Sequence, residues 1–256
     1  MGCNFCLDFL ILPRNNQRFP KEEKMITVRK SEARGLTDIG WLRSYHSFSF
    51  DTYYDPLFMH FRKLRVINED TVMPGLGFSA HPHSDMEIIS YVIKGELQHR
   101  DSMGNGSIIR PGEIQIMTAG TGLTHSEFNP DNREAVHFLQ IWILPEEKGL
   151  PPGYEQKNYL SMLKENDLTL IASREGRDES VVIHQDVDLY TSRLSEKKSI
   201  HIAIREGRFL WIQLIKGELA VAGEKLFAGD ACSLRDRKKV KVRAMKDCEF
   251  LLFDLP

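Results

Sequence analysis

The sequence has few cysteines, no long apolar run and no excess of either charge. Four cysteines are scattered over 256 residues, and the Cys3–Cys6 pair has no second pair downstream. This spacing argues against a disulfide framework and favours a reducing compartment. No apolar stretch reaches the ~18–20 residues that a membrane-spanning helix needs. We therefore expect a cytoplasmic protein that does not engage a membrane.

The charge balance also excludes one class of partner. The formal net charge is −2, which gives no reason to expect direct binding of nucleic acid. Lysine and arginine gather between Arg235 and Arg243, but Asp236 interrupts them and they alternate as on a strand. We interpret this run as a solvated face.

The chain divides into two strand-rich halves of similar pattern. Residues 145–153 hold prolines, glycines and charges, as expected of a linker. The pentapeptide Ile93–Leu97 recurs as Ile215–Leu219, which favours two copies of one domain. We expect an N-terminal extension at 1–24 that is disordered, a metal-binding domain at 25–147 and a degenerate second copy at 148–256 without metal, because its corresponding strand at Phe209–Ile215 has no ligand-type residues.

Short β-rich segments separated by glycine and proline turns predict an all-β fold. Turn signals about every 8–12 residues are typical of sandwiches and barrels. His46–Phe50 alternates polar and aromatic side chains, which predicts a half-buried strand there.

Two short pairs of ligand-type residues dominate the first half: His81-Pro-His83 and His125-Ser-Glu127. Side chains two apart on a strand point to the same face. Two neighbouring strands would then present three imidazoles and one carboxylate to a single point. That set is typical of a metal site with room for a further ligand.

A second carboxylate competes for the same role. Glu87 lies four residues after His83, so spacing alone allows either Glu87 or Glu127 to face the metal. The remaining histidines carry no such pattern, and we expect them to be ordinary polar residues: His46, His60, His99, His137, His184 and His201.

The two pairs lie within patterns that resemble a known family. Gly75, His81, His83 and Glu87 resemble the first cupin motif, whereas the second motif lacks its proline because Gly120 occupies that position. The segments Met117–Glu127, His46–Phe50 and the terminal Leu252–Leu255 resemble the pirin family, especially its bacterial quercetinase-like members. The likeness covers roughly residues 25 to 256.

The resemblance implies two tandem cupin barrels, a bicupin, with the metal in the first. It implies His81, His83, His125 and Glu127 as the metal ligands, with Glu87 as a carboxylate that orients a ligating imidazole. Four protein ligands leave two positions on a six-coordinate ion for a substrate hydroxyl and dioxygen. Such ligands suit Fe(II), Mn(II), Ni(II) or Cu(II). Zinc also binds but has no redox chemistry, and Fe(II) is the first choice.

The activity implied is cleavage of a flavonol such as quercetin by a metal-dependent dioxygenase. Our hypothesis for that reaction is that Glu127 moves off the metal and takes the substrate proton as a general base. Two alternatives stay open. One is a redox-sensing regulatory pirin that binds an unidentified protein partner. The other is a cupin enzyme that acts on a different small molecule.

Overall fold

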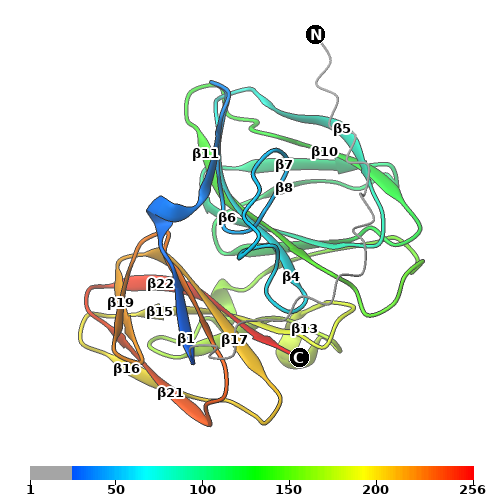
Figure 1. Ribbon diagram of the computed structural model, residues 1–256. Coiled ribbons are helices and arrows are strands. Elements are labelled where there is room, and N and C mark those ends of the chain that lie inside the picture. The colour runs from blue at the N-terminus through cyan, green and yellow to red at the C-terminus, as the bar shows by residue number, and fades with distance from the viewer. Residues whose placement is uncertain (1–24) are drawn as a thin grey trace.

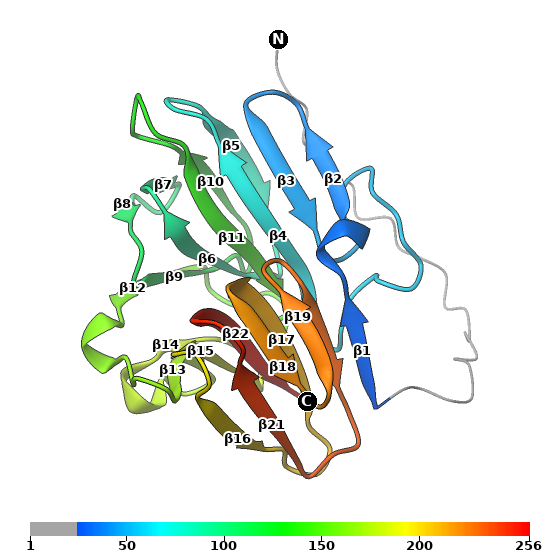
Figure 2. The same cartoon turned by 90° about the vertical axis from the view of Figure 1, so that its left-hand side faces the viewer.

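The computed structural model describes residues 25–256, so the predicted N-terminal extension lies outside the described residues. This part of the chain forms four β-sheets and a few single-turn 3-10 helices (Figures 1 and 2). None of its helices has the length and apolar character needed to cross a membrane. The predicted all-β class is confirmed. The 3-10 helices are η1 (Ser31–Ala33), η2 (Leu160–Met162) and η3 (Arg177–Glu179).

A large and a small sheet build the first barrel. The large sheet runs in the order β12-β9-β6-β11-β4-β3-β2 and the small sheet in the order β5-β10-β7-β8. The strands of the large sheet are β2 (Gly35–Asp38), β3 (Leu42–His46), β4 (Leu64–Val72), β6 (Glu87–Lys94), β9 (Glu113–Thr118), β11 (Val136–Ile143) and β12 (Gly153–Asn158). Those of the small sheet are β5 (Gly77–His83), β7 (Leu97–Asp101), β8 (Gly106–Ile109) and β10 (Leu123–Phe128).

The second barrel has the same two layers. Its large sheet runs β1-β20-β17-β22-β15-β13-β14 and its small sheet β16-β21-β18-β19. The large sheet contains β1 (Ile26–Arg29), β13 (Leu168–Ser173), β14 (Val181–Val182), β15 (Asp188–Leu194), β17 (Phe209–Lys216), β20 (Ala231–Leu234) and β22 (Cys248–Leu255). The small sheet contains β16 (Ser199–Ala203), β18 (Glu218–Val221), β19 (Glu224–Phe227) and β21 (Lys239–Ala244).

The strand orders show that the halves are copies of one topology. The order β9-β6-β11-β4 corresponds to β20-β17-β22-β15, and β5-β10-β7-β8 corresponds to β16-β21-β18-β19. Gly95 and Gly217, from the repeated pentapeptide, occupy equivalent turns and both have φ of +82°. Glycine reaches this left-handed region without the steric penalty of a Cβ. The duplication predicted from sequence is confirmed.

One strand from each half joins the sheet of the other. Strand β1 pairs with β20, and β12 pairs with β9. In Figure 1 the blue β1 accordingly lies in the lower half, beside the strands of the second barrel. The domain limits drawn from the linker stay a prediction. Strand β1 of the first half is hydrogen-bonded to the sheet of the second half, and β12 of the second half to the sheet of the first.

The two large sheets share one apolar core. Trp211 and Phe253 of the second barrel belong to the same buried cluster as Ile67 and Ile89 of the first. Phe48 also packs in it, with its ring centroid 4.8 Å from that of Trp211. The prediction of a strand over His46–Phe50 is therefore wrong, because β3 ends at His46 and the chain turns inward to place Phe48 between the barrels.

The turn before β10 carries the glycine that departs from the cupin pattern. Gly120 has φ of +49°, and a Cβ built there would lie 1.9 Å from the Leu150 carbonyl oxygen. Proline, which is confined to φ near −65°, does not fit this turn. The Leu150 carbonyl of the linker lies this close to Gly120 because it accepts a hydrogen bond from the Thr121 amide at 2.8 Å.

We expect Gly120→Ala to destabilise the protein by about 2–5 kcal/mol, because the methyl group adds a backbone clash to left-handed strain. Gly104→Ala is the matched control, since Gly104 also has positive φ but faces open space, and it should cost about 1–2 kcal/mol. Urea unfolding of both variants measures the difference. Equal losses of stability in the two variants would mean that the contact with the linker does not constrain the turn at Gly120.

Candidate metal centre

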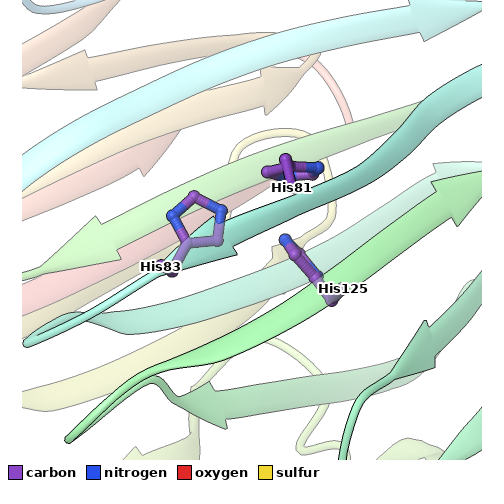
Figure 3. A group of neighbouring side chains, drawn as sticks. All are labelled: His81, His83 and His125. Atoms are coloured by element: carbon purple, nitrogen blue, oxygen red, sulfur yellow. The ribbon is translucent and has the colours of Figure 1, made fainter. Parts of the chain in front are cut away.

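The centre begins with the pairing of β5 and β10. These antiparallel strands place His81 directly opposite His125, and His83 opposite Leu123. The three imidazoles gather on one side of the strand pair (Figure 3). Ring centroids lie 4.5 Å apart for His81 and His125, 4.9 Å for His83 and His125, and 4.8 Å for His81 and His83.

Hydrogen bonds fix which nitrogen of His81 is available. Its Nδ1 lies 2.8 Å from the Ser79 carbonyl oxygen. A carbonyl only accepts, so Nδ1 carries the proton and Nε2 keeps its lone pair. The Nε2 atom of His125 is buried and has no hydrogen-bond partner. Buried polar atoms are almost always satisfied, so this orphaned nitrogen fits a site that takes a cation.

The surroundings keep two of the imidazoles neutral. Burial, followed by repulsion from His81 and His99, lowers the pKa of His125 to about 2. Burial, followed by repulsion from His125 and His81, lowers the pKa of His83 to about 3. Neutral imidazole is the form that binds metals.

The carboxylate of Glu127 is held by two donors. Ser90 Oγ donates to its Oε1 at 2.9 Å, and Gln140 Nε2 donates to its Oε2 at 2.6 Å. A bulge between His125 and Glu127 shifts Glu127 opposite Phe78. One candidate group holds His81, His83 and His125, and a second, deeper group holds His99, His125 and Glu127. His125 is therefore the residue common to both.

Sequence reasoning missed His99, which was expected to be an ordinary polar residue. It is fully buried on β7, with Nδ1 3.5 Å from Nδ1 of His125 and Nε2 3.3 Å from Oδ2 of Asp101. The available signal was the period-two pair His99-Arg-Asp101, which has the same form as the two pairs singled out.

The barrel interior holds a further carboxyl group. Asp70 of β4 is buried, and burial, with repulsion from Glu127 and Glu69, raises its pKa to about 7 despite a hydrogen bond from Ser44. The interior thus gathers polar side chains around Glu127. In the second barrel the corresponding strands β16 and β21 point Ile200, Ile202, Val240 and Val242 inward, while His201 faces out.

An apolar wall lies beside the histidines. The ring centroids of Trp142 and His83 are 5.0 Å apart, and Phe50 packs edge-on against Trp142 at 5.4 Å. Trp142 in turn packs against a buried cluster next to the site: Met86, Ile88, Met117, Ala119 and Leu123. The indole Nε1 of Trp142 is buried without a hydrogen-bond partner.

Glu87 lies away from the imidazoles. Its Oε2 accepts hydrogen bonds from Thr118 Oγ1 at 3.1 Å and from the His184 amide at 3.2 Å. On β6, Ser90 points into the barrel and contacts Glu127, so Glu87, an odd number of residues away, faces the second barrel. The prediction that Glu87 orients a ligating imidazole is wrong, because the turn after His83 resets the alternation between β5 and β6.

Most of the other histidines are ordinary, as predicted. His46 Nδ1 lies 2.8 Å from Asn68 Oδ1 and its Nε2 lies 2.9 Å from Thr37 Oγ1. His137 contacts Glu69, and His60 contacts the Arg62 carbonyl. None of these belongs to the candidate metal groups found among the described residues.

Two family models match the chain. One, described as Pirin, matches residues 27–143. The other, described as Quercetinase C-terminal cupin domain, matches residues 170–255. The first match falls on the first barrel and the second match on the second barrel.

Curated and solved relatives agree with these matches. Quercetin 2,3-dioxygenase of Escherichia coli K12 is 46% identical over 233 residues, 91% of this chain and 99% of that protein. A putative quercetin 2,3-dioxygenase of Pasteurella multocida is 44% identical, covering 90% of this chain and 100% of that protein. The structure of the Escherichia coli bacterial pirin YhhW in complex with nickel(II) is 45% identical, with a TM-score of 0.87, covering 91% of this chain and 99% of that one.

The burial of Glu87 should make the free energy of unfolding depend on pH. Burial raises its pKa above the ordinary 4.5, so the folded state prefers the protonated form. Its contribution to stability is therefore greatest below pH ~4.5 and is lost as the pH rises through the raised folded value. Glu87→Gln should show a free energy of unfolding that falls less than the wild type between pH 4 and 8.

Urea unfolding of chelator-treated protein across that range measures the effect. Glu32→Gln, at an exposed carboxylate, is the control and should follow the wild type. Parallel wild-type and Glu87→Gln curves would contradict the assignment of a raised pKa to Glu87.

Proposed function

The chain belongs to the pirin family, and from this premise we propose that it is a metal-dependent dioxygenase that cleaves a flavonol such as quercetin. The observation that carries the proposal is the convergence of His81, His83 and His125 on one side of β5 and β10. The names of its relatives point to the same activity.

We assign the metal to His81, His83, His125 and Glu127. Three features support this set: the lone pair that His81 presents at Nε2, the orphaned Nε2 of His125, and the low pKa values of His83 and His125. Glu127 shares the inner group with His125 and supplies a negative charge. A mixed imidazole and carboxylate set suits Fe(II), Mn(II), Ni(II) or Cu(II).

Fe(II) stays the first choice of metal, and nickel is the ion in the homologous YhhW complex. When bound, the ion supplies a Lewis acid for the substrate hydroxyl and a redox partner for dioxygen.

The protein side chains provide the rest of the chemistry. Glu127 is the base that takes the proton of the substrate hydroxyl. Ser90 and Gln140 each donate a hydrogen bond to its carboxylate. These two bonds orient the carboxylate, which leaves the metal when it takes the proton.

The apolar wall suits a flat aromatic substrate. Trp142 and Phe50 offer ring edges and faces next to His83, and aromatic pairs favour such contacts. No feature of the described residues favours the regulatory alternative or names a protein partner.

The carboxylate assignment can be tested with a matched pair of variants. Glu127→Gln should weaken Ni(II) affinity by more than about 100-fold, because loss of a ligand exceeds the 10–100-fold typical of a supporting residue. Glu87→Gln should leave the affinity unchanged, since Glu87 faces the second barrel. Competition titration against a chelator measures both, and the reverse order of effects would overturn the assignment.

The activity is tested by oxygen uptake with quercetin. The protein is stripped of metal and reloaded separately with Fe(II), Mn(II), Ni(II) or Cu(II). We expect oxygen consumption with at least one metal and none with His83→Ala, which lacks a ligand. Absence of uptake with every metal, in protein shown to have bound it, would remove the proposed flavonol activity.

A further inference from the structure

On the deeper side of the centre, His125 is linked to a chain of buried polar groups that the proposed reaction does not use. It runs from His125 through His99 to Asp101 and Asn105. His99 and the side chain of Asp101 are both 0% exposed. Fully buried titratable groups are costly unless their hydrogen bonds are satisfied, so the order of donors and acceptors along this chain is constrained.

The constraint starts at Asp101. Its Oδ1 accepts from the amides of Met103 at 2.9 Å and Asn105 at 3.0 Å, and its Oδ2 accepts from Asn105 Nδ2 at 2.8 Å. These groups only donate, so Asp101 is an acceptor in each bond. An acceptor facing His99 Nε2 requires that this nitrogen carry a hydrogen.

The hydrogen on Nε2 of His99 then determines whether Nδ1, on the other side of the ring, carries a hydrogen or a lone pair. A neutral His99 protonated at Nε2 has a bare Nδ1, which faces Nδ1 of His125 at 3.5 Å. Two bare nitrogens would repel, so His125 carries its hydrogen on Nδ1. Its Nε2 is left with the lone pair, and that is the atom without a partner in the protein.

We propose that His99, oriented by Asp101, is a positioning residue that sets the tautomer of His125 so that Nε2 is free to bind the metal. His81 achieves the same result more simply, because its Nδ1 donates directly to the Ser79 carbonyl. His125 has no such carbonyl partner and relies on His99. The link to metal binding rests on the proposed function, whereas the tautomer itself does not.

The exchanged strand β12 holds His99 in this orientation. The ring of Tyr154 packs on that of His99 with centroids 5.1 Å apart and planes inclined by 31°. The Tyr154 hydroxyl is in turn fixed by Ser107 Oγ at 2.5 Å and Gln156 Oε1 at 2.8 Å. The strand that crosses to the first barrel thus supports the deepest part of the centre.

The test compares His99→Leu with His99→Gln. Leucine fills the space without hydrogen bonds, whereas the glutamine amide can donate to Asp101 and accept from His125 Nδ1. Nitrogen-15 NMR of the histidine rings in metal-free protein reports the tautomer directly. We expect His125 protonated at Nδ1 in the wild type and in His99→Gln, and a shift toward the Nε2-protonated form in His99→Leu.

Nickel affinity provides the second readout. It should fall by about 10–100-fold in His99→Leu and recover most of the loss in His99→Gln. A wild-type His125 protonated at Nε2, or a His99→Leu protein with the wild-type tautomer and affinity, would overturn the proposal. A wild type with the expected tautomer that binds no metal would leave the role of His99 intact and instead refute the proposed metal function.

Discussion

The antiparallel register between β5 and β10 is the constraint on which the centre depends. It places His81 across from His125 and leaves His83 one pleat away on the same face. A slip of one residue would turn the imidazoles of one strand to the opposite face. The bulge after His125 then moves Glu127 out of simple alternation and into contact with Ser90 and Gln140. The chemistry of the site is thus a consequence of strand pairing.

The second barrel shows what the same topology does without a cluster of histidines. Where β5 and β10 bring histidines together, β16 and β21 bring isoleucines and valines, and the interior becomes an apolar core. In the first barrel, polar side chains occupy part of the corresponding interior. Its stability is supplemented by the cluster shared between the two large sheets and by the strands β1 and β12 that each half contributes to the other.

Local pattern was enough to predict the repeated pentapeptide turns and the convergence of His81, His83 and His125, because these depend on glycine and on the period of a strand. It could not predict which way Glu87 points, because a short turn separates His83 from Glu87 and the alternation of side chains does not continue through that turn. Phe48 alternates as on a strand, yet its place is decided by Trp211, which is distant in sequence. The pair formed by His99 and Asp101 is visible in the sequence, but the contact of His99 with His125 arises only when β7 pairs with β10.

The most direct test of this account is anomalous diffraction from crystals of the protein soaked in nickel(II). We expect one strong peak within roughly 2.0–2.3 Å of a ring nitrogen of each of His81, His83 and His125, with a carboxylate oxygen of Glu127 completing the set. A peak elsewhere in the molecule, with those three imidazoles left without metal, would contradict it.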